Sequence, residues 1–422
     1  MSLLLDSVSK ILLFDGATGT QLQQYGLKAD ECPELCNDTH PDRIRKLYVS
    51  YKQAGSQVIQ TNTFGANRIK LKKFGLESKV AQLNEKAVRI AREVMGEDGL
   101  VSASIGPTGD FLKPYGSLTF DELYDVFAEQ IQAVAQAGAD IINIETMMDI
   151  SEARIALLAS LENTKLPTIC SFTFEKQGRT LMGSPPNVLV EIVQALGAAA
   201  VGANCSGGPD ELLPIIVEMK KYASVPLLVQ PNAGLPTVVD GKAVYPLTPE
   251  AMAKASVKLV KAGANILGGC CGTTPEHIRH MAKAVDRLEA VPPGRLVEEC
   301  ICSKYQAVPI SDVQDRLLGL KVSRSTQAFD LLDKILSSGI ESPVPLLSFD
   351  DSLSADEIRK ALAELESLTK QPLAFELSSD WQAEAALRQY SGRAGVVIKE
   401  NRSNIEGIAQ KYGAVIFEQF NS

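Results

Sequence analysis

Short apolar runs alternate with longer amphipathic stretches over the first two thirds of this 422-residue chain, and this alternation constrains the fold most. Eight runs have the length of buried strands, at residues 11–14, 58–60, 101–105, 141–144, 168–172, 200–203, 226–229 and 264–267. The stretches between them space apolar residues three and four apart, as in residues 41–54, 121–137, 151–161 and 249–262. Eight strand-then-helix units predict an α/β fold, a (β/α)8 TIM barrel.

Capping signals favour the same alternation. Glycine just past a helix adopts the left-handed backbone that turns the chain into the next strand. Four predicted helices end this way, at Gly55, Gly138, Gly197 and Gly263. Thr273 or Thr274, before Pro275, is expected to cap the helix that follows the eighth run. The alternative fold is a doubly wound open sheet, whose usual glycine-rich phosphate turn is matched only loosely by residues 16–20.

Polar residues gather at the carboxyl ends of the predicted strands. They are Asp15, Asn62, Glu145, Cys205, Asn232, Cys270 and Cys271. In a TIM barrel the carboxyl ends of all strands meet at one mouth, where active sites are found. We therefore expect residues far apart in the sequence to share one site.

Three of these strand-end residues are cysteines. Cys270 and Cys271 are adjacent within the glycine-rich residues 268–272, and Cys205 ends the sixth run. Only one strand separates the sixth from the eighth in a barrel, so the three sulfurs can reach one ion. Three thiolates with an open fourth position are a catalytic zinc arrangement. Glycine would let the backbone come close around that ion.

Two alternatives concern the same cysteines. Free cysteine is commonly a buried core residue, and for Cys170, inside the fifth run, we expect that. A thiol in the open position would become a thiolate nucleophile, whereas water there would support hydrolysis. The soft, all-sulfur ligand set favours thiol activation.

Composition excludes several classes of function. The net charge of −9 and pI near 5.2 argue against a surface for nucleic acid or anionic membranes. No segment approaches the apolar length of a membrane span, and no signal peptide is recognisable, so a cytoplasmic location is expected. Eight cysteines in a cytosolic chain of this size indicate metal or catalytic use rather than disulfides.

The pattern changes after Gly294. We expect the barrel domain over residues 1–294, a linker region over 295–325 and a smaller α/β domain over 326–422. Strand-like runs in the last part lie at 344–349, 373–377, 394–398 and 414–417. Helices are expected at 326–337, 355–368, 381–389 and 404–412.

Six motifs of the barrel region resemble those of the homocysteine S-methyltransferase family, and most closely the homocysteine-binding module of cobalamin-dependent methionine synthase. They lie at residues 15–20, 61–64, 145–149, 202–205, 231–234 and 268–275. The resemblance implies a zinc-containing barrel in which Cys205, Cys270 and Cys271 hold the metal and carry catalysis. It also implies that the homocysteine sulfur takes the fourth position and attacks a methyl donor.

Further roles follow from the same resemblance. Glu145 would bind the amino group of homocysteine, although a solvated or helix-capping acid is the alternative. Asp15 and the turn formed by Gly16, Ala17 and Thr18 are candidates for orienting the amino-acid head. Asn232 would contact the metal or the substrate, or hold its loop.

The last part of the chain resembles, weakly, a piece of the pterin-binding barrel of methionine synthase, over residues 372–417. It is too short for a second barrel, which needs about 250 residues, and is expected to dock a partner. No cobalamin-binding histidine motif is present. We therefore expect methyl transfer to homocysteine thiolate, forming methionine, from methylcobalamin on a separate corrinoid protein. The alternatives are a sulfonium or betaine donor, another thiol acceptor, and a binding module with a structural ion.

Overall fold

The computed structural model describes residues 10–28, 30–239, 242–399 and 402–417. The chain forms two compact units, which are described separately. The first comprises residues 1–182 and 198–295, and the second comprises residues 183–197 and 296–422. Among the described residues, no helix is both long enough and apolar enough to span a membrane.

Eight parallel strands form the sheet of the first unit. They are β1 (Leu12–Leu13), β2 (Val58–Gln60), β3 (Leu100–Ile105), β4 (Ile141–Met147), β5 (Thr168–Phe172), β6 (Ala200–Cys205), β7 (Leu227–Pro231) and β10 (Ala264–Leu267). Their order is β1-β10-β7-β6-β5-β4-β3-β2. A parallel bridge between Phe14 and Val58 joins the two ends of this order and closes the sheet. The predicted TIM barrel is confirmed, and the open sheet is excluded.

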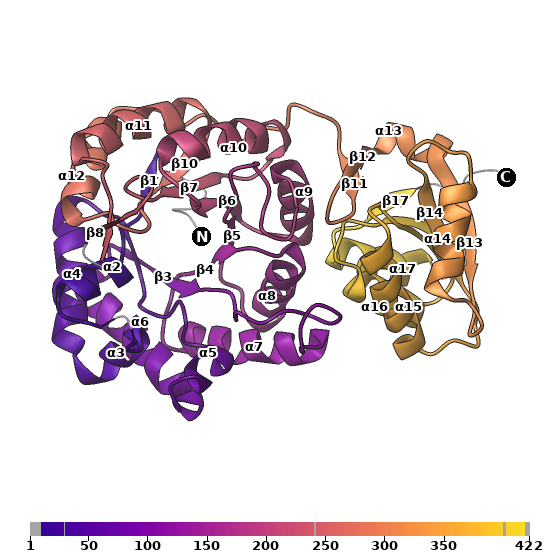
Figure 1. The fold of residues 1–422 in the computed structure, drawn as a ribbon, viewed down its shortest axis with the longest axis horizontal. Coiled ribbons are helices and arrows are strands. Elements are labelled where there is room, and N and C mark those ends of the chain that lie inside the picture. Colours follow the sequence, from indigo (N-terminus) through magenta and orange to yellow (C-terminus); the bar gives the residue numbers. More distant parts are fainter. Residues whose placement is uncertain (1–9, 29, 240–241, 400–401, 418–422) are drawn as a thin grey trace. The chain divides into compact units, whose positions relative to one another are not determined.

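Helices follow the strands in alternation and surround the barrel (Figure 1). The main helices of this unit are α4 (Pro41–Ala54), α6 (Val80–Met95), α7 (Phe120–Gln136), α8 (Ile150–Asn163), α10 (Pro209–Tyr222), α11 (Pro249–Lys261) and α12 (Pro275–Val285). The four glycines predicted to end helices all have left-handed φ angles, between 96° and 117°. Thr274 caps α12 by accepting a hydrogen bond from the His277 amide, and this leaves Thr273 free for another role.

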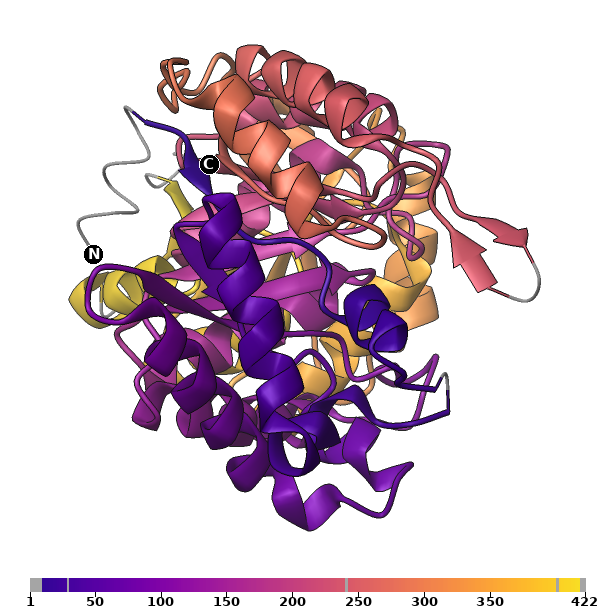
Figure 2. The ribbon, with the colours of Figure 1, turned by 90° about the vertical axis from the view of Figure 1, so that its left-hand side faces the viewer.

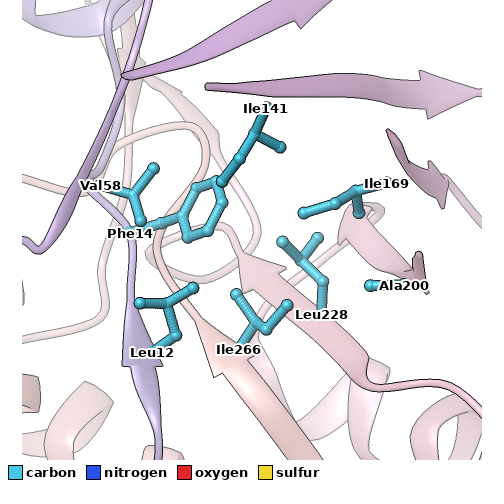
Figure 3. Packing of buried hydrophobic residues seen from close by; sticks show 8 residues of the cluster. All are labelled: Leu12, Phe14, Val58, Ile141, Ile169, Ala200, Leu228 and Ile266. Carbon is cyan, nitrogen blue, oxygen red and sulfur yellow. The ribbon is translucent and has the colours of Figure 1, made fainter. Parts of the chain in front are cut away.

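Apolar side chains from the strands fill the barrel. Figure 3 shows the cluster that lies near the amino-terminal ends of the strands. Its members come from seven different strands or their ends and are Leu12, Phe14, Val58, Ile141, Ile169, Ala200, Leu228 and Ile266. This packed layer fills the barrel near the amino-terminal ends of the strands. A site is therefore expected at the carboxyl ends of the strands.

Several short elements complete the first unit. They are α2 (Gly19–Gln24), η1 (Pro33–Leu35), α3 (Cys36–Thr39), α5 (Arg68–Lys72) and η2 (Glu77–Lys79). A hairpin of β8 (Thr237–Val239) and β9 (Lys242–Val244) is inserted between β7 and α11. Figure 2 shows this hairpin projecting from the barrel. This hairpin was not predicted, because residues 235–248 show no long apolar alternation.

The second unit contains five parallel strands in sequential order. They are β13 (Leu317–Val322), β14 (Val344–Phe349), β15 (Ala374–Leu377), β16 (Gly395–Ile398) and β17 (Val415–Phe417). The connecting helices are α14 (Ala328–Ser337), α15 (Ala355–Leu368), α16 (Asp380–Gln389) and α17 (Arg402–Lys411). Helix α9 (Pro186–Leu196), which follows β5 in the chain, groups with this unit.

Residues 295–325, expected to be a linker, contain regular structure. They include β11 (Cys300–Cys302), β12 (Ala307–Pro309), α13 (Ile310–Val313), η3 (Gln314–Arg316) and β13. Ile301 and Val308 of the β11–β12 hairpin pack on the sheet residues Val344 and Ala374. Strand β13 was not predicted. It lies at the sheet edge among the described residues, and the exposed residues Gly319 and Lys321 interrupt its apolar pattern.

Candidate metal and substrate site

The three strand-end cysteines come together. Cys205 is the last residue of β6, and Cys270 and Cys271 lie in the turn between β10 and α12. Their sulfur atoms all lie within 4.8 Å of one another. Among the described residues they form the only group of three or more His, Cys, Asp or Glu side chains arranged closely enough to hold an ion. The predicted ligand set is therefore assembled by the fold.

The backbone around Cys205 is strained. Cys205 and Ser206 have φ angles of 59° and 58°, and Thr146 at the end of β4 has 60°. Non-glycine residues adopt such angles rarely, and they do so mostly at functional sites. The Asn204 side chain holds two of these segments together, because its Oδ1 accepts from the Thr146 amide (2.9 Å) and its Nδ2 donates to the Thr146 hydroxyl (2.7 Å).

The glycines around the cysteine pair make room for protein side chains. A Cβ atom on Gly269 would collide with the Thr273 side chain, and one on Gly272 would collide with the Tyr245 ring. Gly272 also has a left-handed φ of 78°. These glycines were predicted to let the backbone approach an ion, but two of them are required by the side chains of Thr273 and Tyr245.

The three thiols differ in proton affinity. Hydrogen bonds from the Cys270 and Cys271 side chains, and another from the Asn232 side chain, hold the pKa of Cys205 well below its ordinary value. The same interaction with Cys205 raises the pKa of Cys270. The Asn232 amide therefore donates to sulfur, while its buried Oδ1 has no partner among the described residues. Three clustered sulfurs and a free oxygen form a donor set that fits a thiophilic divalent ion such as zinc.

A pocket of about 300 Å³ joins the cysteines to a buried acid. Cys205, Cys270 and Cys271 line it together with Glu145. The turn from Gly16 to Thr20 forms another part of the wall. The carboxyl group of Glu145 and the three sulfurs thus share one pocket.

Glu145 is buried at the end of β4. Its Oε1 accepts hydrogen bonds from Gln60 Nε2 (2.9 Å) and from the Ser104 hydroxyl. Burial raises the pKa of Glu145 to about 7, although both hydrogen bonds act in the opposite direction. A positively charged ligand group would restore the charged form.

The predicted head-binding turn is placed at the pocket, with one qualification. Gly16, Ala17 and Thr18 line it, but the Ala17 amide already donates to the Thr273 hydroxyl (3.0 Å). Asp15 is buried next to this turn and does not line the pocket. Its Oδ2 accepts a hydrogen bond from the Gln60 amide (3.0 Å), and burial raises the pKa of its carboxyl group. Its Oδ1 is buried and has no partner among the described residues, so Asp15 can still serve the site.

Asn62 has a structural role in this arrangement. Its side chain donates to the Pro33 carbonyl and to Asn37, and thereby anchors the loop that follows β2. Cys170 is fully buried inside β5, as expected for a core residue.

Four polar residues of the site were not singled out from the sequence. Gln60 is the last residue of β2 and Ser104 the last but one of β3, and both lie inside the predicted runs 58–60 and 101–105, whereas Glu145 follows its run. Asn204 directly precedes Cys205 in its motif. Tyr245 hydrogen-bonds the Cys271 sulfur from the segment after the β8–β9 hairpin, and nothing in the sequence marks this position.

Comparisons with known proteins agree with this geometry. The family model described as homocysteine S-methyltransferase matches residues 12–285. Methionine synthase from Mycobacterium tuberculosis is 34% identical over 329 residues, which are 73% of this chain and 27% of that protein. Methionine synthase from Mycobacterium leprae is 33% identical over 325 residues, which are 72% of this chain and 27% of that protein. The chain thus spans about a quarter of the length of these relatives.

A solved structure shares the fold. The metallated form of the homocysteine methyltransferase MmuM from Escherichia coli superposes with a TM-score of 0.56 at 24% identity, over 65% of this chain and 96% of that one. Because the family model covers well over half of the chain, including all three cysteines and Glu145, this chain belongs to the homocysteine S-methyltransferase family.

Proposed function

We propose that this protein transfers a methyl group to the sulfur of homocysteine and so forms methionine. The observation that carries the proposal is the single pocket lined by three clustered cysteines and by Glu145. Homocysteine has a thiol at one end and an ammonium and a carboxylate at the other. The membership of the family and the relatives named methionine synthase support the same reaction.

Each end of the substrate has a complementary group in this pocket. Glu145 would accept hydrogen bonds from the ammonium, and this charge-assisted contact would return the carboxyl to its ionised form. The backbone of the turn from Gly16 to Thr18 would orient the carboxylate, with Asp15 supporting the turn. The thiol would then point toward Cys205 and the adjacent cysteine pair.

Cys205, Cys270 and Cys271 would hold a zinc ion, and Asn232 Oδ1 is the neighbouring oxygen still able to bind it. When bound, zinc would lower the pKa of a thiol in its open position and thereby supply the thiolate nucleophile. The new sulfur–carbon bond forms as the bond between the methyl group and its carrier breaks, and the thiol proton leaves to solvent.

For the donor we propose methylcobalamin carried by a separate corrinoid protein. Large apolar side chains are exposed on the segments that follow β3, β5 and β7. They are Tyr115, Leu181, Leu235 and Val244. A small sulfonium or betaine donor needs no exposed apolar side chains outside the pocket, whereas a protein that carries the donor would cover them. This function is proposed for the cytoplasm, without a nucleic-acid or membrane partner.

Methionine formation tests the reaction and the donor separately. Zinc-loaded protein and homocysteine would be incubated with a methylated corrinoid protein, with S-methylmethionine or with betaine. Methionine from the corrinoid arm alone is expected. Turnover of a sulfonium or betaine donor without turnover of the corrinoid would refute the donor assignment, and no methionine in any arm would refute the reaction. A competing panel of thiols would identify a different acceptor.

Cys205→Ala distinguishes a catalytic ion from a structural one. We expect the variant to fold, because Cys205 ends its strand and the barrel core lies at the other end of the sheet. It should lose both zinc and methionine formation. A variant that unfolds would instead indicate that the ion holds the loops together. Zinc content and circular dichroism measure the two properties independently.

A further inference from the structure

The backbone of Ala17 in the substrate-binding turn is hydrogen-bonded at both its amide and its carbonyl group. The Ala17 amide donates to the Thr273 hydroxyl at 3.0 Å, and the Ala17 carbonyl accepts from the Tyr51 hydroxyl at 2.8 Å. Tyr51 lies in the last turn of α4, and its side chain is fully buried. Ala17 therefore has little freedom to move within the pocket wall.

The same two side chains also hold the cysteine turn. The Thr273 hydroxyl donates to the Cys270 carbonyl at 2.7 Å, and the Tyr51 hydroxyl lies 3.2 Å from the Thr273 carbonyl. The Gly269 amide adds a bond to the Asp15 carbonyl at 2.9 Å. The turn after β1 and the turn after β10 are therefore linked through the atoms of Tyr51 and Thr273.

The two turns and the side chains of Tyr51 and Thr273 are closely packed. A Cβ atom on Gly16 would lie 2.7 Å from the Thr273 hydroxyl and 2.9 Å from the Tyr51 ring, closer than any side chain can approach. Thr273 is fully buried, so its hydroxyl has no water to replace either of its partners. The separation of the two turns is thus set by direct contacts.

We infer that Tyr51 and Thr273 are positioning residues that fix the distance between the amino-acid head of the substrate and the cysteine pair, and thereby select thiols by chain length. The inference rests on the proposed function, in which the turn at Ala17 faces the head and Cys270 and Cys271 face the sulfur. Cysteine has the same head as homocysteine and one methylene fewer. With the two turns held at a fixed separation, its sulfur cannot reach the cysteine group while its head stays in place.

Calorimetric binding of L-homocysteine and L-cysteine to the zinc-loaded full-length protein tests this selection without a methyl donor. The wild type should prefer homocysteine by roughly 10- to 200-fold, the discrimination that one methylene usually gives. In Tyr51→Phe the preference should fall by about fivefold, the effect of one lost hydrogen bond. Zinc content should stay unchanged in this variant.

Two further variants cover the case in which Tyr51→Phe does not fold. Thr273→Val removes the hydroxyl at similar volume, and Thr273→Ser keeps it. The preference for homocysteine should fall in the first and return in the second. Tyr390→Phe is the control, because Tyr390 is a buried tyrosine of the second unit whose hydroxyl also bonds two backbone groups, the Cys302 carbonyl and the Leu373 amide. It should lose comparable stability and keep the wild-type preference.

The outcomes separate the inference from the function on which it rests. A wild type that prefers homocysteine, together with folded Tyr51→Phe or Thr273→Val variants of unchanged preference, would overturn the inference alone. An equal loss of preference in Tyr390→Phe would also overturn it, since the effect would then be one of general stability. A wild type that binds neither thiol would overturn the proposed function and the inference together.

Discussion

Replacing Glu145 with glutamine should make the metal-free protein more stable at high pH, although it removes a binding group. The side chain is fully buried, and burial raises its pKa from 4.5 to about 7. Glutamine keeps the shape and an oxygen that can accept from Ser104 and Gln60, and it carries no charge. The substitution therefore isolates the energy of holding a buried carboxylate that has no cation beside it.

The size of the effect follows from the pKa. A tenfold change in proton affinity is worth about 1.4 kcal/mol, so ionising Glu145 in the folded protein costs about 3 kcal/mol more than in the unfolded chain. The folded protein binds the proton more tightly, so this loss of stability develops as pH rises from about 4.5 to about 7 and is complete above it. Glu145→Gln should match the wild type near pH 4.5 and exceed it by about 3 kcal/mol at pH 8.

Urea unfolding followed by far-ultraviolet circular dichroism at pH 4.5, 6 and 8 measures this difference. The single tryptophan, Trp381, lies in the second unit and would not report on the barrel. Homocysteine binding should weaken by about 10- to 150-fold in the same variant, as expected for a lost hydrogen bond to a charged group. Equal stability of the two proteins at pH 8 would refute the assignment of a buried, unpaired carboxylate.

Three further predictions concern the same pocket. The affinity of the wild type for homocysteine should fall as pH drops below about 7, where Glu145 takes up a proton. The affinity of Glu145→Gln should not show this fall near pH 7. Ser104→Ala removes a hydrogen bond that lowers the Glu145 pKa, so the pH at which homocysteine binding weakens should rise. An unchanged pH of weakening would contradict the hydrogen bond between Ser104 and Glu145. Tyr245→Phe removes the hydrogen bond to the Cys271 sulfur and should weaken zinc binding by about 10- to 100-fold in a chelator competition, with Tyr115→Phe on an exposed loop as the unaffected control.

The barrel and the meeting of its three cysteines could be predicted because both depend on local patterns with a fixed geometric consequence. Apolar runs of strand length predict buried strands, and parallel strands in a closed barrel bring their carboxyl ends to one mouth. Cys205, Cys270, Cys271 and Glu145 each end or follow a strand, so they could be selected without knowledge of any side-chain contact. Gln60 and Ser104 lie inside the predicted runs 58–60 and 101–105 rather than after them, so the same rule does not select them.

The remaining site residues act through contacts that leave no periodic signal. Tyr51 has the spacing of an ordinary core residue of α4, and its role depends on the hydroxyl alone. Thr273 and Thr274 were equal candidates for the helix cap, and only the three-dimensional structure shows that Thr274 caps while Thr273 bonds Ala17. Tyr245 reaches Cys271 from an inserted hairpin whose position no strand pattern predicts.

The site is linked on two sides, and this arrangement explains why its backbone is strained. Asn204 bonds Thr146, so the residue beside Glu145 and the residue before Cys205 move together. Thr273 bonds both Ala17 and the Cys270 carbonyl, which ties the opposite pair of turns. Four segments that end or follow different strands are thus joined in pairs, and each pair contains one cysteine segment and one segment proposed to bind the amino-acid head. Left-handed angles at Thr146 and Cys205 persist because these bonds hold them, so the separation of the paired segments is fixed by the protein itself.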